Sequence, residues 1–280
     1  TRFHKAKEDA QFAKQASSTP QTSSEAYKLA FQDKEFLLRD DLRPIRFQLE
    51  LLKPELLLDE AKIASTMVIY GSARIPEPQD AEGLEAAAGD DRSRSIARNL
   101  KAKARYYDEA RKLACIASQT PDDDQGRRHY VVCSGGGPSI MEAANRGAHD
   151  CGKESIGLNI VLPHEQAPNQ YVTPYLSFHF HYFALRKMHF LLRARAVAVF
   201  PGGFGTFDEM FELLTLIQTG KVKPIPIVLF GKEFWNRVVN FEALVEEGVV
   251  SAGDLKLFQF VETAEEAWSV IENFYDALDD

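Results

Sequence analysis

Residues 196–209 read AVAVFPGGFGTFDE, and this stretch decides the fold. The first five residues, 196–200, are apolar and are followed by a proline and two glycines. A short apolar run that stops at such residues is typical of a buried parallel strand. A helical pattern then runs from Thr206 to Gln218. The stretch therefore predicts a strand, a glycine-rich turn and a helix, in that order.

The same order of strand and helix recurs on both sides of this stretch. The other predicted strands are residues 66–70, 130–133, 155–161, 176–180, 225–230 and 257–261, and the other predicted helices are residues 92–118, 138–149, 183–195, 233–247 and 264–278. Alternating strands and helices form a parallel sheet with helices on both faces. The predicted fold is therefore α/β, a doubly wound parallel sheet of Rossmann-like type over residues 66–280. Residues 75–92, with two prolines, predict an exposed loop.

The first 65 residues have a different pattern and predict an N-terminal helical arm that is partly flexible. Residues 1–23 are polar and predict a loose end. Helices are predicted over residues 24–38 and 44–58, with a kink or restart at Pro54. The second helix is rich in leucine, so it has to cover either its own sheet domain or a partner subunit. Both arrangements remain open.

The composition argues against several classes of protein. Of the 280 residues, 45% are apolar and 26% are charged, which are ordinary values for a globular protein. The net charge of −8 makes the chain a poor general binder of nucleic acid. The chain has no run of 18 apolar residues and no apolar leader, so neither a membrane span nor a signal peptide is predicted.

The cysteines argue for a reducing compartment. Cys115, Cys133 and Cys151 are odd in number and widely spaced, and they form no CxxC motif. This pattern argues against a disulfide scaffold and against a structural zinc site. We therefore predict a cytoplasmic protein without a structural zinc site.

Three predicted strands end in glycine-bearing turns. Glycine lets a ligand approach backbone N–H groups, and a helix N-terminus behind the turn favours phosphate. The turns are Gly71-Ser72-Ala73-Arg74, Ser134-Gly135-Gly136-Gly137-Pro138-Ser139 and Pro201-Gly202-Gly203-Phe204-Gly205-Thr206. One such turn is often only tight geometry, but three at the carboxyl edge of one sheet predict a phosphate or nucleotide site. The GxGxxG and GxxxxGK[ST] motifs are absent, so the usual NAD and P-loop sites are not indicated.

Two further segments each have two interpretations. The segment TFDE at 206–209 has the spacing of a capping box, in which Thr206 caps the helix and Glu209 reaches back to it. A carboxylate beside a phosphate-binding turn can instead face a bound sugar. Arg186 and Lys187 form a basic pair on a predicted helix, which is either solvated surface or part of the same site.

Together these motifs resemble the LOG ("Lonely Guy") family, whose members also carry the older description of possible lysine decarboxylases. Residues 201–209 match the family's PGGxGTxxE signature. Three other segments agree with the family in kind and in order: Gly71-Ser72-Ala73-Arg74, Ser134-Gly135-Gly136-Gly137 with Met141, and Arg186-Lys187. The resemblance covers about residues 66–280, and the arm and the 75–92 segment exceed the compact family members.

The resemblance implies a phosphoribohydrolase that cleaves the N-glycosidic bond of a nucleoside 5′-monophosphate of the AMP or cytokinin riboside type. The products are free base and ribose 5-phosphate. It implies catalytic roles for Arg186 and Glu209, and no metal or cofactor. The substrate-binding residues it implies are Gly71, Ser72, Arg74, Ser134, Gly135, Gly136, Met141, Lys187, Gly202, Gly203, Gly205, Thr206 and Asp208. It also implies a homodimer or a larger homo-oligomer.

A second function stays open, which is a nucleotide-binding or sensing protein of the same fold with little turnover. The presence of both Arg186 and Glu209 favours the hydrolase. A decarboxylase is not indicated, because the sequence has no pyridoxal-binding constellation. A DNA-binding role is disfavoured by the net charge of −8.

Overall fold

The computed structural model describes residues 3–163 and 167–279. The chain forms two compact units, Thr1–Leu52 and Lys53–Asp280. The sequence predicted a domain boundary after residue 65, whereas the boundary between these units lies between residues 52 and 53. Helix α3 (Arg43–Glu60) ends between these two positions.

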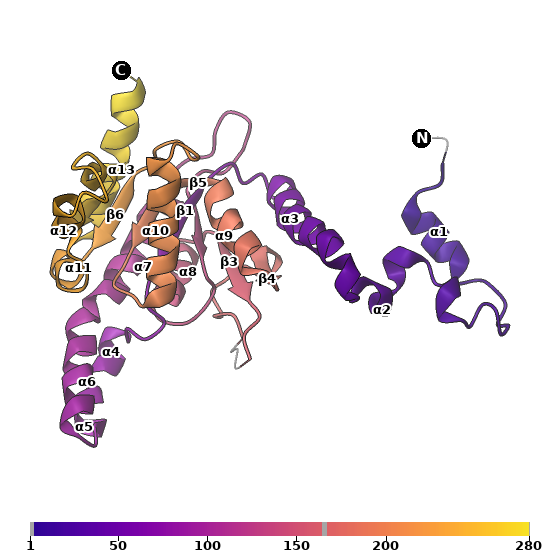
Figure 1. The fold of residues 1–280 in the computed structure, drawn as a ribbon, viewed down its shortest axis with the longest axis horizontal. Helices are drawn as coiled ribbons and strands as arrows, with labels where there is room; N and C mark the ends of the chain where they lie inside the picture. Colours follow the sequence, from indigo (N-terminus) through magenta and orange to yellow (C-terminus); the bar gives the residue numbers. More distant parts are fainter. Residues whose placement is uncertain (1–2, 164–166, 280) are drawn as a thin grey trace. The chain divides into compact units, whose positions relative to one another are not determined.

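The larger unit is built on a seven-stranded sheet in which every pair of neighbours is parallel (Figure 1). The strands are β1 (Thr66–Tyr70), β2 (Val131–Ser134), β3 (Ser155–Ile160), β4 (Ser177–Phe180), β5 (Ala194–Val199), β6 (Ile227–Phe230) and β7 (Gln259–Val261). Their order is β4-β3-β2-β1-β5-β6-β7. The chain starts in the middle of the sheet, builds one half, and returns to build the other. The predicted doubly wound fold is confirmed.

Helices cover both faces of this sheet. One face packs on α7 (Arg105–Ser118), α8 (Ile140–Asp150) and α13 (Ala264–Asp279), and the other on α9 (Phe183–Leu192), α10 (Phe204–Gln218), α11 (Lys232–Val238) and α12 (Phe241–Glu246). Strand β1 shows why both faces are needed. Met67 and Ile69 belong to the first core, and Val68 and Tyr70 to the second. Side chains alternate across a strand, so a strand that is apolar throughout must be buried on both faces.

The segment predicted as an exposed loop, 75–92, is partly helical and partly buried. It contains α4 (Pro78–Ala81) and α5 (Leu84–Ala87), and Ile75 and Ala81 are buried. The loop prediction was therefore wrong, because a proline in the first turn is compatible with a helix and alanine favours one.

Two predicted helices are each divided in the structure. The stretch 92–118 forms α6 (Asp91–Lys103) and α7, which meet at Ala104. The stretch 233–247 forms α11 and α12, and Asn240 caps the second with its side chain. Both divisions turn the chain without a glycine or proline, so no breaker residue announces them in the sequence.

The smaller unit also differs from its prediction. A helix, α1 (Ala6–Ala13), lies within the region predicted as a loose end. The predicted helix at 24–38 is instead a series of short turns: η1 (Glu25–Tyr27), η2 (Ala30–Gln32) and α2 (Lys34–Leu37), followed by η3 (Asp40–Leu42). Helix α3 continues through Pro54. Among the described residues of this unit only Ala10 is buried, so the unit has almost no core of its own.

One disulfide joins Cys115 at the end of α7 to Cys151 after α8. The odd number and wide spacing of the cysteines did not predict it. Helices α7 and α8 pack side by side and bring the two Cα atoms to 5.7 Å, although 36 residues separate them in sequence. In the described residues, no helix is both long and apolar enough to cross a membrane.

Candidate active site

The three glycine-bearing turns come together at one edge of the sheet. They follow β1, β2 and β5, which are neighbours in the order β2-β1-β5. A cavity of about 880 Å³ opens there. Ten of the predicted site residues line it: Gly71, Ser72, Arg74, Met141, Arg186, Gly202, Gly203, Gly205, Thr206 and Glu209. This is the carboxyl edge, at a point where the strand order reverses, which is where open α/β sheets bind ligands.

The first turn of α10 forms one wall of the cavity. Gly203 is the N-cap residue of this helix, and no side chain caps it. The first amides of a helix have no acceptor within the helix. The residues that carry them line the cavity, and with the dipole of a 15-residue helix these amides can hold an anion.

The glycines of this turn have different functions. A Cβ on Gly202 would lie 2.1 Å from Thr206 Oγ1, so the packing of the turn itself requires glycine there. A Cβ on Gly203 or Gly205 would meet no atom within 4 Å. Neither of these two has the positive φ that would demand glycine. Their missing side chains leave room for a ligand to approach the backbone.

The capping-box interpretation of Thr206 and Glu209 is wrong. Helix α10 begins at Phe204, two residues earlier than the pattern predicts, so Thr206 lies inside the first turn and is buried. Glu209 is one turn further along and does not cap the helix. Glycines at 203 and 205 hid the true start, because glycine is a poor helix former.

Glu209 instead faces Arg186 from the neighbouring helix α9. Arg186 Nη1 and Glu209 Oε1 are 3.4 Å apart, and the two side chains are only 11% and 14% exposed. Burial raises the pKa of Glu209 to about 7, although the Arg186 guanidinium acts in the opposite direction. A carboxyl group with this pKa can hold or release a proton near neutral pH.

Arg186 is held in place by its own contacts. Its Nε donates to the backbone oxygen of Leu158, at 2.6 Å, and its guanidinium lies 5.0 Å from the ring centre of Phe190. A Cβ on Gly135 would lie 2.7 Å from Arg186 Nη2. The glycine of the second turn therefore makes room for the arginine.

Ser134 and Gly136 shape the second turn and do not line the cavity. The Ser134 hydroxyl donates to Asn145 Oδ1 at 2.7 Å and accepts from the amide of Gly136 at 3.0 Å. Gly136 has a φ of +72° and lies against Asn159. Asn169 Nδ2 donates to the oxygens of both Asn145 and Gly137. These asparagines support the turn, and no motif in the sequence indicated them.

Lys187 and Asp208 also lie outside the lining of the cavity. Lys187 Nζ is 2.9 Å from Asp208 and 3.2 Å from Glu212, both on α10. The structure therefore brings Arg186 and Glu209 to the cavity and leaves the residue beside each of them in a separate ion-pair cluster.

The rest of the cavity wall is apolar, and sequence reasoning missed it. Its residues come from the end of β3, the loop after it and the helices α9, α10 and α11, so no local pattern reveals them. They are Ile160, Leu162, Phe183, Phe204, Phe207, Phe234 and Val238. Such a wall suits the flat face of an aromatic ring.

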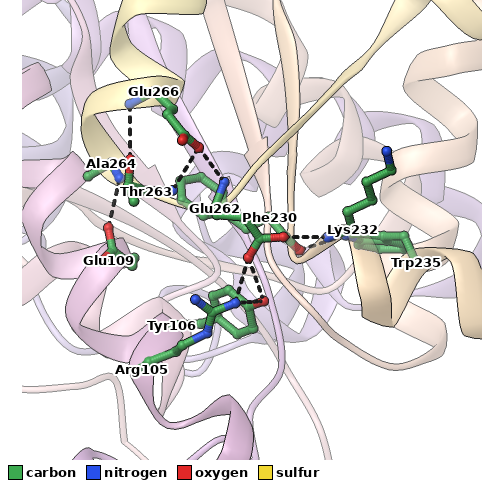
Figure 2. A network of polar contacts seen from close by, with 10 residues as sticks. All are labelled: Arg105, Tyr106, Glu109, Phe230, Lys232, Trp235, Glu262, Thr263, Ala264 and Glu266. Carbon is green, nitrogen blue, oxygen red and sulfur yellow. Dashed lines mark hydrogen bonds and ion pairs between the residues drawn. The ribbon is translucent and has the colours of Figure 1, made fainter.

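Glu262 fixes the helix that supplies Phe234 and Val238 (Figure 2). Its Oε1 accepts from the amide of Lys232 at the start of α11, at 3.0 Å. Its Oε2 accepts from Tyr106 Oη at 3.2 Å and from Arg105 Nη2 at 2.5 Å. One carboxylate thus ties α11 to α7 and to the end of β7.

Comparisons with known proteins find similar sequences over much of the larger unit. The family model described as "Possible lysine decarboxylase" matches residues 141–271. Cytokinin riboside 5′-monophosphate phosphoribohydrolase LOG2 of Arabidopsis thaliana is 26% identical over 187 residues, which are 64% of this chain and 80% of that protein. Probable cytokinin riboside 5′-monophosphate phosphoribohydrolase LOG4 of Oryza sativa subsp. japonica is 27% identical over 139 residues, 49% of this chain and 59% of that protein.

Solved structures resemble the chain more distantly. The protein called TM1055 is 19% identical, with a TM-score of 0.46, and the match covers 75% of this chain and 99% of that one. The Moco carrier protein from Chlamydomonas reinhardtii is 16% identical, with a TM-score of 0.44 over 76% of this chain and 99% of that one.

Proposed function

We propose that this chain, which belongs to the LOG family, hydrolyses the N-glycosidic bond of a nucleoside 5′-monophosphate. The products would be free base and ribose 5-phosphate, with AMP or a cytokinin riboside monophosphate as substrate. One observation supports this most strongly: the buried Glu209–Arg186 pair opens into the same cavity as the uncapped start of α10. The named relatives are phosphoribohydrolases of cytokinin riboside 5′-monophosphates.

In this proposal the 5′-phosphate binds at the first turn of α10. Backbone amides of the turn donate to its oxygens, and Gly203 and Gly205 let it come close. Gly71, Ser72 and Arg74 contribute from the turn after β1, and Met141 lies beside them. Binding energy from this remote group holds the ribose in position for the reaction.

Glu209 and Arg186 act at the other end of the ribose. Cleavage of the C1′–N bond leaves its electron pair on the base and positive charge on the sugar ring. The Glu209 carboxylate stabilises that charge and accepts a proton from the attacking water, whose oxygen bonds to C1′. The departing base takes up a proton from the solvent, and Glu209 later releases its proton to the solvent, so that one water molecule is consumed overall. Arg186 keeps the carboxylate in position through the contact of 3.4 Å.

The predicted binding residues outside the cavity act indirectly in this proposal. The Lys187–Asp208 pair aligns α9 with α10, and these helices carry Arg186 and Glu209. Ser134 and Gly136 set the turn after β2, and Gly135 leaves space for Arg186.

The competing function is a nucleotide-binding or sensing protein with little turnover. Incubation with AMP, GMP, CMP and UMP, with chromatography for free base, separates the two. If the protein is a hydrolase, free base should be released from at least one purine nucleotide. Saturable binding of a nucleotide that stays intact would favour the sensor.

The pH dependence of the reaction follows from Glu209. Because the carboxylate is the active form and its pKa is about 7, kcat/KM should rise about tenfold per pH unit below 7 and level off above it. The phosphate of the substrate also titrates near pH 6, so the profile has to be measured again with a phosphorothioate substrate, whose pKa is lower. A Glu212→Gln variant is the matched protein control and should keep the profile of the wild type. A profile that is flat between pH 5.5 and 8 would contradict this role of Glu209.

Gly205→Ala should separate ligand binding from stability. The new methyl group meets no protein atom, so unfolding should cost the same free energy or about 0.5–1 kcal/mol more. KM for the nucleotide should rise at least ~10-fold, because the methyl group occupies space next to the backbone amides that bind the phosphate. Gly202→Ala is the contrasting variant, since its methyl group collides with Thr206 and should lower the melting temperature. Unchanged KM in Gly205→Ala would place the phosphate elsewhere.

We also propose that the chain works as a homodimer or larger homo-oligomer. Phe204 at the mouth of the cavity is 97% exposed, and Phe183 and Met188 on α9 are about half exposed. A second chain would cover this apolar surface. Light scattering tests the proposal: it predicts at least twice the 31.5 kDa of one chain, and a monomer mass contradicts it. The cytoplasmic location stays a prediction.

A further inference from the structure

A second cavity, of about 870 Å³, lies far from the candidate active site in the architecture of the sheet. It opens at the amino ends of β2 and β5, whereas the first cavity is at the carboxyl edge. The end of α7 and one side of α13 form its walls. Nothing in the proposed hydrolysis uses it.

Arg195 lines this cavity and lies between two tyrosines. Its guanidinium carbon lies 4.2 Å from the ring centre of Tyr275 and 5.5 Å from that of Tyr130. Its Nε donates to Tyr130 Oη at 2.9 Å, and Tyr275 Oη donates to the backbone oxygen of Arg195 at 2.6 Å. An arginine held in this way loses little conformational freedom when it binds a further group.

The two terminal nitrogens of Arg195 remain available. Within residues 3–163 and 167–279, the guanidinium forms no ion pair, and its one side-chain hydrogen bond uses Nε. Arg195 lines the cavity, and its two NH₂ groups keep two parallel donors, a geometry suited to a ligand edge with two adjacent acceptors.

Two further features of the wall are unusual. Tyr130 has a φ of 51°, in the left-handed region that bulky residues rarely adopt. Such strain persists where the surroundings hold it, and it concentrates at functional sites. Thr120 Oγ1 is buried without a hydrogen-bond partner among the described residues, and Thr120 also lines the cavity. A buried hydroxyl without a partner indicates a group that the protein alone does not supply.

The remaining lining residues define the shape and charge of the ligand. Trp268 offers an aromatic surface, packed edge-on against Tyr130 at 5.2 Å between ring centres. Glu272 and Asp276 lie exposed at the rim and disfavour an anion. The cavity therefore suits a flat, uncharged ring with two neighbouring acceptors.

We propose that this cavity binds an uncharged 6-oxopurine, as the base or the nucleoside, through its O6 and N7 atoms. Arginine pairs with these two acceptors through two parallel hydrogen bonds. An adenine ring has an amino group in place of O6. This amino group is a donor, and it would face a donor NH₂ group of Arg195 without an acceptor between them. The site distinguishes guanosine and inosine from adenosine on this ground. The proposal stands independently of the proposed hydrolysis.

Titration of the full chain with guanosine, inosine and adenosine tests this proposal, by calorimetry and by tryptophan fluorescence. Trp268 lines the cavity, whereas Trp235 is fully buried in the opposite core, so ligand-dependent quenching reports on Trp268. Guanosine and inosine should bind saturably at one site per chain, with adenosine at least ~10-fold weaker. Excess ribose 5-phosphate, which would fill the candidate active site, should leave guanosine binding unchanged.

Arg195→Lys keeps the charge between the tyrosines but removes the pair of parallel donors, and Arg195→Met removes both. Each substitution should lower the affinity for guanosine at least ~10-fold. Thermal unfolding shows which variants are folded. If Arg195→Met does not fold, Arg195→Lys alone tests the proposal. The proposal is overturned by the absence of saturable guanosine binding, by equal affinity for adenosine, by competition from ribose 5-phosphate, or by unchanged affinity in a folded Arg195 variant.

Discussion

Glu209→Gln is expected to lower kcat at least ~10²-fold, because the amide cannot stabilise the positive charge that develops on the ribose. The side chain keeps its size, and its oxygen can still accept from Arg186 Nη1. Binding of the nucleotide should therefore change little, and the loss should fall on kcat. The matched control is Glu212→Gln, one turn further along α10 and part of the Lys187 cluster, which should stay within a few fold of wild type.

The same variant makes a second measurement possible, on stability. The pKa of Glu209 is raised from 4.5 to about 7, so the folded state favours the protonated form. The stability contributed by that form is present below pH 4.5 and is lost as the pH rises through 7. Glutamine does not ionise, so the melting temperature of Glu209→Gln relative to wild type should increase between pH 5 and pH 8. A constant difference across this range would contradict the burial of an ionising Glu209.

Removal of the 5′-phosphate is expected to lower kcat/KM at least ~10³-fold, when adenosine is compared with AMP. Hydrogen bonds to a charged group contribute about 1.5–3 kcal/mol each, and the first turn of α10 offers more than one amide donor. Gly205→Ala should reduce the difference in kcat/KM between AMP and adenosine, because the substitution weakens the binding of AMP and leaves the reaction of adenosine unaffected. Steady-state rates with both substrates measure this, and equal rates on both would show that the phosphate is not the anchor.

The sequence predicted the sheet well because each strand carries its own signal. Apolar runs that end at glycine or a polar residue are local, and residues 66–70 coincide with β1 as predicted. The order of strands and helices then restricts the topology to a doubly wound sheet. What failed was local structure without such a signal, as in α4 and α5, where a proline-containing and alanine-rich segment fits a loop and a short helix equally.

The sequence indicated the separate turns and residues of the site but not the contacts that bring them together. Glycine-rich turns after strands were visible, but the start of α10 at Phe204 was not, because the capping-box spacing at 206–209 offered a plausible alternative. The Arg186–Glu209 contact joins two helices and depends on tertiary packing. Lys187 is adjacent to Arg186 in sequence and still points to a different cluster, since consecutive residues on a helix face different directions.

The apolar wall and the second cavity had no sequence signature. Phe234 reaches the first cavity because Glu262, 28 residues later, caps its helix. Arg195 and Tyr275 are 80 residues apart and meet only in the folded chain. Such sites depend on contacts between distant segments, which periodicity and motif spacing do not record.

The most direct test of the proposed hydrolysis is a single-turnover reaction with the protein in excess over AMP, in water enriched in oxygen-18. Hydrolysis by Glu209 would give adenine and ribose 5-phosphate in equal amounts, with the heavy oxygen at C1 of the sugar, and formation of both should be at least ~10²-fold slower with Glu209→Gln. AMP that is bound but recovered intact, at every pH from 6 to 8, would contradict the proposed hydrolysis and favour a nucleotide-binding protein.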